Sequence, residues 1–250
     1  MKSLSKAEKL LYSLGITSPA DIDLEVIAWT QNVLVKTRPL EGCEARIFGK
    51  GDVAIISVNE NSRSTRQRFS IAHELGHWNN DRGMNFYCSS RDMEIGFKNS
   101  KLAERLANYF AADLLFPNFL FKPIVRKTPE LTWDVIKDVA NSFNTSLTAT
   151  AFRFIDSNEY PVILAVYNSN MERLWAKRSS QIPEKWSPKD TIATPQSIKW
   201  NESGMFPVSA DYWFDQDECD EYEIEEQTLQ YADRILSLLT IKDERMLGLE

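Results

Sequence analysis

The sequence predicts an α+β fold in which helices surround a small antiparallel sheet and are followed by a helix pair and a small β-rich C-terminal domain. Two observations predict this order. The longest stretches with helical spacing of apolar residues, 64–79 and 100–116, follow three short β-prone segments in the first half of the chain. Beyond Tyr160, short β-prone segments alternate with turns. We therefore expect a first domain over residues 1–158 and a second over residues 159–250.

The composition is that of an ordinary globular protein. Of 250 residues, 43% are hydrophobic and 26% are charged, which is enough for one sizeable core and a smaller second unit. No apolar run approaches the roughly 18 residues of a membrane-spanning helix, so no membrane association is expected. A net charge of −7 disfavours generic nucleic-acid binding. Three widely spaced cysteines, Cys43, Cys88 and Cys219, favour reduced thiols and a cytoplasmic location.

The first part of the chain is predicted to form two helices and three strands. Helical spacing of apolar residues places the helices over residues 4–14 and 21–31. The β-prone segments are residues 33–35, 45–48 and 53–58, and turn signals separate them. Short connections of this kind predict a small antiparallel sheet.

Two further helices are expected within residues 131–155, joined near Asn144-Thr145-Ser146. Their spacing resembles a helix-turn-helix. We favour two packed helices of a helical subdomain, because the segment has little basic charge with which to bind phosphate. We therefore expect no direct nucleic-acid binding, although DNA binding by this helix pair stays open as an alternative.

The last part of the chain is predicted to be rich in strands. The expected strands cover residues 161–167, 173–177, 222–231 and 234–241. The apolar spacing in the last of these fits a helix equally well. A dense acidic run over residues 215–226 is interpreted as a solvated loop or strand edge, with a docking surface for a basic partner as the alternative.

The two histidines of the chain stand one helical turn apart in His73-Glu74-Leu75-Gly76-His77. This spacing puts both imidazoles on the same helix face, where two nitrogens can reach one zinc ion at about 2.0–2.1 Å. Gly76 is a poor helix former that would permit the close approach of another element beneath the metal. The pattern therefore predicts a zinc site, with an exposed helix carrying incidental histidines as the alternative.

A catalytic zinc site usually takes three protein ligands and leaves a fourth position open. Glu104 falls on the apolar arc of the second long helix, where an unpartnered carboxylate would be costly to bury. It is therefore the favoured third ligand. Asp81 and Glu94 are competing carboxylates, and an ion pair of Glu104 with Arg66 or Arg68 is the alternative that needs no metal.

Two segments around these residues carry a resemblance to the ImmA/IrrE family of zinc metallo-endopeptidases. They are Ser70-Ile71-Ala72-His73-Glu74-Leu75-Gly76-His77 and Glu104-Arg105-Leu106-Ala107-Asn108-Tyr109-Phe110-Ala111-Ala112-Asp113-Leu114-Leu115-Phe116-Pro117. The likeness covers about residues 45 to 155. Phe116 replaces the usual Met, and Asn80-Asp81 stands where many members have Leu-His, which removes a spare histidine from the rim of the site.

The resemblance implies a zincin-like catalytic domain that holds one Zn²⁺ per chain. By it, His73, His77 and Glu104 are the zinc ligands and Glu74 is the catalytic base. Known members of the family cut a DNA-binding repressor, so the implied partner is a protein substrate, namely a helix-turn-helix repressor in a stress-response or mobile-element circuit. The β-rich C-terminal domain is then expected to regulate the enzyme or to dock its substrate.

The implied reaction is hydrolysis of a peptide bond. Glu74 would take a proton from water activated by zinc and pass it to the leaving amine. Tyr109 and Tyr87 are candidates for stabilising the oxyanion. The alternative is a non-catalytic regulatory module in which zinc staples two helices and Cys88 closes the fourth position.

Overall fold

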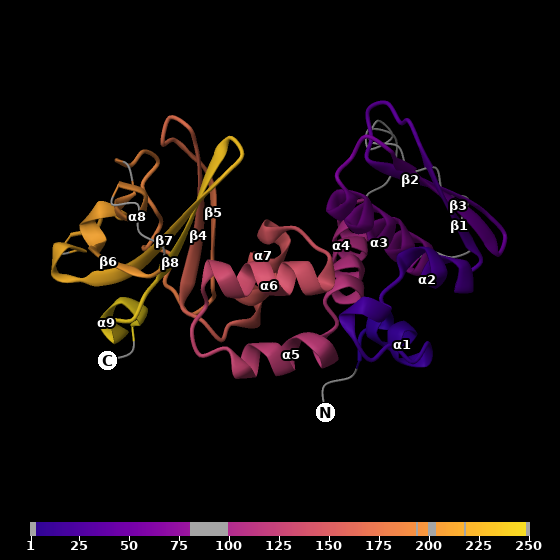
Figure 1. The fold of residues 1–250 in the computed structure, drawn as a ribbon, viewed down its shortest axis with the longest axis horizontal. Helices are drawn as coiled ribbons and strands as arrows, with labels where there is room; N and C mark the ends of the chain where they lie inside the picture. Colours follow the sequence, from indigo (N-terminus) through magenta and orange to yellow (C-terminus); the bar gives the residue numbers. More distant parts are fainter. Residues whose placement is uncertain (1–3, 81–99, 194, 200–203, 218, 249–250) are drawn as a thin grey trace. The chain divides into compact units, whose positions relative to one another are not determined.

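The structure, a computed structural model, folds into two compact units (Figure 1). It describes residues 4–80, 100–193, 195–199, 204–217 and 219–248. Unit 1 comprises Met1–Ile124 and Ala140–Ser146, and unit 2 comprises Val125–Val139 and Leu147–Glu250. Helices and two separate sheets confirm the predicted α+β class. The division expected between residues 158 and 159 stays a prediction.

Unit 1 contains the helices and strands that the first half of the sequence predicts. Its strands are β1 (Val33–Arg38), β2 (Ala45–Lys50) and β3 (Val53–Asn59). Its helices are α1 (Lys6–Ser13), α2 (Leu24–Thr30), α3 (Ser64–Asn80) and α4 (Ser100–Leu115), with a 3-10 turn at Pro19–Asp21. Helix α5 (Asn118–Lys127) was not expected, because Pro123 lies inside it. That helix forms despite the proline, and Phe121, in the part of it that belongs to unit 1, is buried.

The three-stranded sheet has the order β1-β3-β2. Strands β2 and β3 form an antiparallel hairpin in which Ile47 lies opposite Ile56. The fully antiparallel sheet that the short turns predict is wrong in one pairing, because β1 runs parallel to β3, with Val33 beside Ala54. The reason is topological: β3 returns from β2 and inserts between the two earlier strands, so it runs alongside β1 in the same direction.

The two faces of this sheet differ. The inner face consists of alternate residues that are buried, namely Val33, Ile47, Ala54 and Ile56. It packs on α3, where a Cβ atom added to Gly49 would lie 2.6 Å from the Trp78 ring. The outer face consists of the intervening residues, among them the exposed side chains Leu34, Phe48, Val53 and Ile55.

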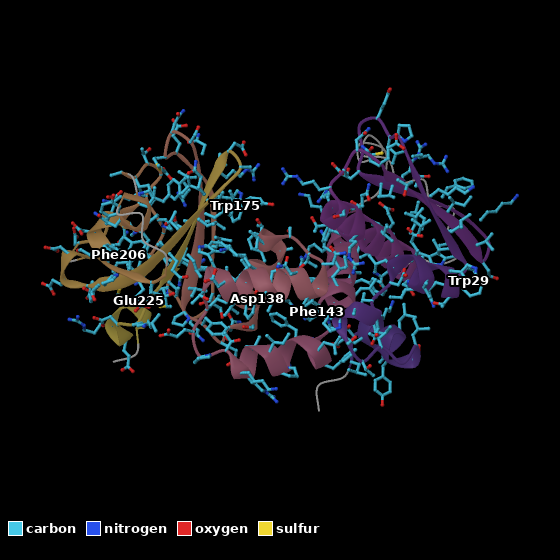
Figure 2. All side chains as sticks on the ribbon, in the orientation of Figure 1. Trp29, Asp138, Phe143, Trp175, Phe206 and Glu225 are labelled. Carbon is cyan, nitrogen blue, oxygen red and sulfur yellow. The ribbon has the colours of Figure 1, made fainter. Side chains whose placement is uncertain are left out.

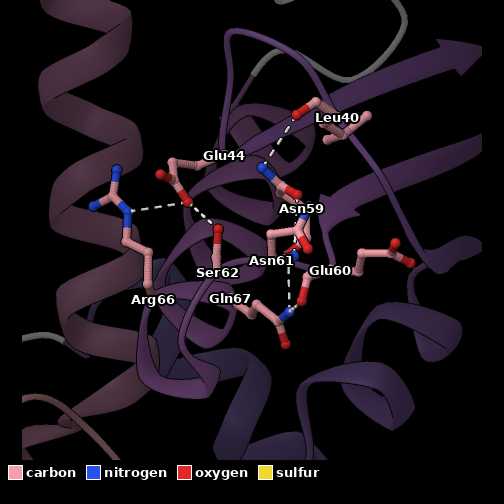
Figure 3. A network of polar contacts seen from close by, with 8 residues as sticks. All are labelled: Leu40, Glu44, Asn59, Glu60, Asn61, Ser62, Arg66 and Gln67. Atoms are coloured by element: carbon pink, nitrogen blue, oxygen red, sulfur yellow. Dashed lines mark hydrogen bonds and ion pairs between the residues drawn. The ribbon is translucent and has the colours of Figure 1, made fainter.

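A polar network fixes the connection from β3 into α3 (Figure 3). Asn59 lies at its centre. The side-chain amide of Asn59 donates to the Leu40 backbone carbonyl at 3.2 Å, and the backbone carbonyl of Asn59 accepts from the Gln67 side-chain amide at 2.8 Å. Glu44, immediately before β2, accepts a hydrogen bond from Ser62, and its carboxylate lies 3.8 Å from Nε of Arg66. The first turn of α3 is therefore tied to the sheet.

Helices α3 and α4 pack against each other at Gly76. A Cβ atom added there would lie 2.8 Å from both the Cα and the carbonyl oxygen of Ala107, on the backbone of α4. This contact confirms the expectation that Gly76 permits the close approach of another element. The glycine thereby brings the histidine-bearing turn of α3 against the first half of α4.

Unit 2 contains a five-stranded antiparallel sheet with the order β5-β4-β8-β7-β6. The strands are β4 (Val162–Asn168), β5 (Arg173–Arg178), β6 (Phe206–Ser209), β7 (Glu223–Tyr231) and β8 (Arg234–Thr240). Helix α7 (Leu147–Ser157) lies in this unit, and α6 (Trp133–Phe143) begins in it. The remaining short helices are α8 (Gln196–Lys199), α9 (Glu244–Leu247) and 3-10 turns at Ala210–Tyr212 and Cys219–Glu221.

Two features of unit 2 correct the expectations. The helical alternative for the last segment is wrong, because β8 lies inside the sheet between β4 and β7. Strand β6 was not expected, because it contains Pro207; it occupies an edge of the sheet, which is where a strand tolerates proline. One buried cluster that includes Trp186, Trp213 and Phe214 forms the core of this unit.

The expected helix pair is present as α6 and α7. In unit 2 the start of α6 is anchored to β7, because the Trp133 indole donates to the Gln227 carbonyl at 3.0 Å. Within the described part of the chain, no helix combines the length and the hydropathy of a membrane span. Cys43 and Cys219 are free thiols, and Cys88 lies outside the described residues.

Candidate metal centre

Helices α3 and α4 of unit 1 bring three predicted ligands together. Nε2 of His73 lies 3.3 Å from one carboxylate oxygen of Glu104, and Nε2 of His77 lies 3.2 Å from the other. The two Nε2 atoms lie 3.1 Å apart. The ligand atoms of the three residues all fall within 4.8 Å of one another. These atoms converge on one point, as the ligands of a single ion would.

The ion pairs that would have explained Glu104 without a metal are not formed. Nε of Arg66 lies 3.8 Å from Glu44 instead, and the Arg68 guanidinium donates to the Ile22 carbonyl at 3.2 Å. Among the described residues, the ion-pair partners of Glu104 are the two histidines. The competing ligands Asp81 and Glu94, together with Cys88 and Tyr87, lie outside the described residues.

Glu104 is less buried than the helical arc predicts. Its side chain is 34% exposed, and Leu106, on the same predicted arc, is 43% exposed. The face of α4 that is fully buried is centred on Ala107, Ala111 and Leu114, where Gly76 of α3 comes close. The first turns of α4 are therefore covered on one side only, and Glu104 lies at the rim of the site.

Asn108 is a member of the site that the spacing argument missed. Its Oδ1 lies 3.0 Å from Nδ1 of His73. Because an amide oxygen can only accept, this contact requires a proton on Nδ1 and leaves the lone pair on Nε2, which faces Glu104. Asn108 stands four residues after Glu104, one turn along the same helix face, and that spacing is the signal that would have found it.

Glu74 lies between the histidines in sequence and is held against the sheet. Its side chain is buried, at 6% exposure, and one carboxylate oxygen accepts a hydrogen bond from the Ile47 backbone N–H of β2. The other oxygen, Oε2, has no hydrogen-bond partner among the described residues. Burial, together with the neighbouring negative charge of Glu104, raises the pKa of Glu74 to about 8, against the opposing effect of the Ile47 hydrogen bond.

The helix, sheet and ligand segments lie inside one region that matches a known family. The sequence profile of the IrrE N-terminal-like domain, Peptidase_M78, matches residues 30–154. The chain belongs to this family. Peptidase_M78 membership points to a metallopeptidase, and it confirms the resemblance to ImmA/IrrE proteins that the sequence predicts.

A solved structure shares the fold of this M78 chain. A Mycobacterium tuberculosis transcriptional regulator matches it with a TM-score of 0.59 and 13% sequence identity, over 94% of this chain and 74% of that one. At this identity the likeness shows the fold alone. None of the curated proteins compared with the chain matches it significantly.

The residues of the M78 site fit a zinc ion. Two imidazole nitrogens and a carboxylate oxygen are a donor set of open zinc sites, with three protein ligands and room for one more. Asn108 accepts from Nδ1 of His73 and so fixes its tautomer, and a metal-binding histidine usually has such a partner on its other ring nitrogen. The orphan oxygen of Glu74 is a buried polar atom that water at the open position would satisfy.

Proposed function

We propose that this M78-family chain is a zinc-dependent endopeptidase in which His73, His77 and Glu104 hold one zinc ion and Glu74 is the general base. The observation that carries the proposal is the convergence of three ligand atoms beside a buried carboxylate that has one unpartnered oxygen. Zinc, when bound, lowers the pKa of water at its open position toward about 7 and polarises a carbonyl oxygen.

Glu74 is positioned to accept a proton and to donate it again. The Ile47 N–H holds one of its oxygens, so the carboxylate has a fixed orientation and its free oxygen Oε2 is available to water. In the proposed reaction Glu74 acts in its ionised form, which the positive charge of a zinc ion held by Glu104 would favour. Its Oε2 then accepts the proton of the attacking water and returns it to the leaving amine. Glu74 is not one of the three clustered ligands. It can therefore carry the proton while His73, His77 and Glu104 stay in place.

Strand β2 supports a polypeptide substrate. In the described part of unit 1 it pairs with β3 alone, so its other edge carries backbone groups that do not pair with a strand. An extended peptide can bind along such an edge through main-chain hydrogen bonds. Ile47 belongs to this strand and contacts Glu74, so a peptide on the edge would lie beside the catalytic base. This arrangement would suit the binding of an extended polypeptide substrate.

The substrate class rests on the family resemblance. We propose that the substrate is a DNA-binding repressor of the helix-turn-helix type, in a stress-response or mobile-element circuit. A structural neighbour that is a transcriptional regulator is compatible with a regulatory role. Unit 2 is proposed to regulate the enzyme or to dock the substrate. In its acidic run over residues 215–226, Glu226 is buried in β7, and the exposed acidic residues before β7 suit a basic partner. Tyr109, whose side chain is 60% exposed, stays a candidate for oxyanion stabilisation.

The test is a cleavage assay with a candidate helix-turn-helix regulator, taken from the genes next to this one if such a regulator is encoded there. The purified proteins are mixed with and without Zn²⁺, and the products are identified by mass spectrometry. We expect cleavage that needs zinc, stops with a chelator and is absent in Glu74→Gln. Cleavage by Glu74→Gln, or cleavage that survives removal of zinc, would contradict the proposed mechanism.

A further inference from the structure

The outer face of the three-stranded sheet in unit 1 is apolar and exposed. Phe48, Ile55 and Leu34 lie side by side across β2, β3 and β1, and they are 56%, 37% and 49% exposed. Val53 and, from α2, Trp29 extend the same surface, at 60% and 74% exposure. Single exposed hydrophobic residues are ordinary, but a contiguous row of them marks a binding surface.

This surface is hollowed as well as apolar. A groove of about 710 Å³ is lined by Trp29 of α2 together with residues of all three strands, among them Leu34, Phe48 and Ile55. Figure 2 shows Trp29 projecting from unit 1 at the surface. The volume lies within the range of about 300–1,000 Å³ that is usual for ligand sites. The groove is therefore large enough to take several side chains of a partner.

The charge of the same face is strongly one-sided. The three strands contain four basic residues, Lys36, Arg38, Arg46 and Lys50, and no Asp or Glu, although the whole chain carries a net charge of −7. By strand alternation all four lie on the outer face. In the described part of the chain, Lys36, Arg46 and Lys50 form no ion pair with an acidic side chain. These cations are available to a partner.

We propose that the outer face binds a peptide segment of a separate protein in which hydrophobic side chains are flanked by Asp or Glu. Its apolar side chains would cover the row Phe48, Ile55 and Leu34, and its carboxylates would meet Lys50 on one side of that row and Arg46 and Lys36 on the other. This role goes beyond the proposed peptidase activity. The inner face carries α3 and the metal centre, so an occupied outer face leaves the proposed active site open.

Charge also argues against the other occupants. A second copy docked through the same face would place four cations against four cations, which disfavours a symmetric dimer. Single-stranded nucleic acid would match the cations, but the centre of the face is mainly aliphatic, whereas nucleotide bases stack on aromatic rings. The acidic net charge of the chain further disfavours nucleic acid.

The test begins with selection of random displayed peptides on the full-length chain. We expect the enriched peptides to combine aromatic or aliphatic residues with Asp or Glu. A synthetic, dye-labelled peptide of about ten residues, enough to cross the sheet at 3.3 Å per residue, is then titrated by fluorescence anisotropy. We expect Lys36→Glu with Arg46→Glu to weaken its binding by about tenfold or more, and salt to weaken it as well.

The matched control is Lys9→Glu with Lys122→Glu, which makes the same change of charge at exposed positions of unit 1 outside the sheet. It should bind as the unaltered chain does, and Leu34→Ser should bind more weakly with its thermal unfolding unchanged. Enriched peptides without acidic residues, or equal binding by the two double variants, would overturn the proposal. So would a dimer in sedimentation equilibrium that Leu34→Ser abolishes, or tighter binding of a single-stranded oligonucleotide to the same face.

Discussion

The inner and outer faces of the three-stranded sheet depart from the usual distribution of residues in opposite directions. On the inner side a carboxylate, Glu74, is buried and keeps one oxygen without a partner. On the outer side Phe48 and Leu34 face solvent. A buried polar group and an exposed apolar row each cost stability, and both are retained on a sheet of three strands. Both departures fit the two proposed roles, with chemistry on the side that carries α3 and recognition on the outer face.

The largest expected effect is the loss of peptide cleavage when Glu74 is replaced. Glu74→Gln removes the proton acceptor but keeps the shape of the side chain and the Ile47 hydrogen bond. Peptide cleavage should therefore fall by about 10²- to 10⁴-fold. Zinc content, measured by atomic emission, should stay at one ion per chain, because Glu74 is not one of the clustered ligands. Glu60→Gln, at an exposed glutamate of the same unit, is the control and should cleave normally.

A matched pair of leucines compares the two faces directly. Leu75 of α3 is fully buried, so Leu75→Ala should cost about 2–5 kcal/mol of unfolding free energy. Leu34 is 49% exposed, and Leu34→Ala should stay within about 0.5 kcal/mol of the unaltered chain. Denaturant titration measures both. Equal losses would mean that the outer face is covered in the folded protein, and the proposed docking surface would then be wrong.

Gly76→Ala tests whether close packing of α3 on α4 holds the ligands together. The added methyl would lie 2.8 Å from the backbone of Ala107, which cannot move without shifting α4. We expect a loss of about 1–3 kcal/mol in unfolding free energy. Because Glu104 lies on α4, zinc affinity should fall as well. Unchanged zinc affinity in a destabilised variant would show that the ligands do not depend on this contact.

The smallest effect concerns the orientation of one ligand. Asn108→Ala removes the acceptor for Nδ1 of His73, and zinc affinity should fall by about 10- to 100-fold. Asn108→Asp keeps an acceptor at that position and should restore most of the affinity. Competition with a chromophoric chelator measures both values. Equal zinc affinities in the Ala and Asp variants would show that Asn108 does not fix the tautomer of His73.

The parts of the site that follow from local spacing were predictable from the sequence. His73 and His77 are one turn apart on a single helix, and Glu104 stands out as a carboxylate among apolar neighbours. Asn108 was missed although it stands one helical turn after Glu104, because only the packing of α4 on α3 brings that face to His73. The exact burial of Glu104 also depends on which part of α4 meets Gly76, which is a tertiary fact.

The fold was predictable in its elements and less so in its pairings. The strands of unit 1 were predicted correctly. The parallel pairing of β1 with β3 was not predicted, because it joins segments that are distant in sequence. The exposed outer face could not be foreseen, because the apolar run Val33-Leu34-Val35 reads as a strand buried on both sides. In unit 2, β8 had a spacing that suits helix or strand, and its two neighbours β4 and β7 decide the outcome.

We propose that helices α3 and α4 hold an open zinc site made by His73, His77 and Glu104. X-ray absorption at the zinc edge of the purified protein tests it most directly. We expect nitrogen and oxygen ligands alone, at about 2.0–2.2 Å, with the imidazole signal lost in a His73→Ala, His77→Ala double variant. A sulfur ligand at about 2.3 Å would show a site closed by a cysteine, as in a zinc-stapled module, and would contradict the account.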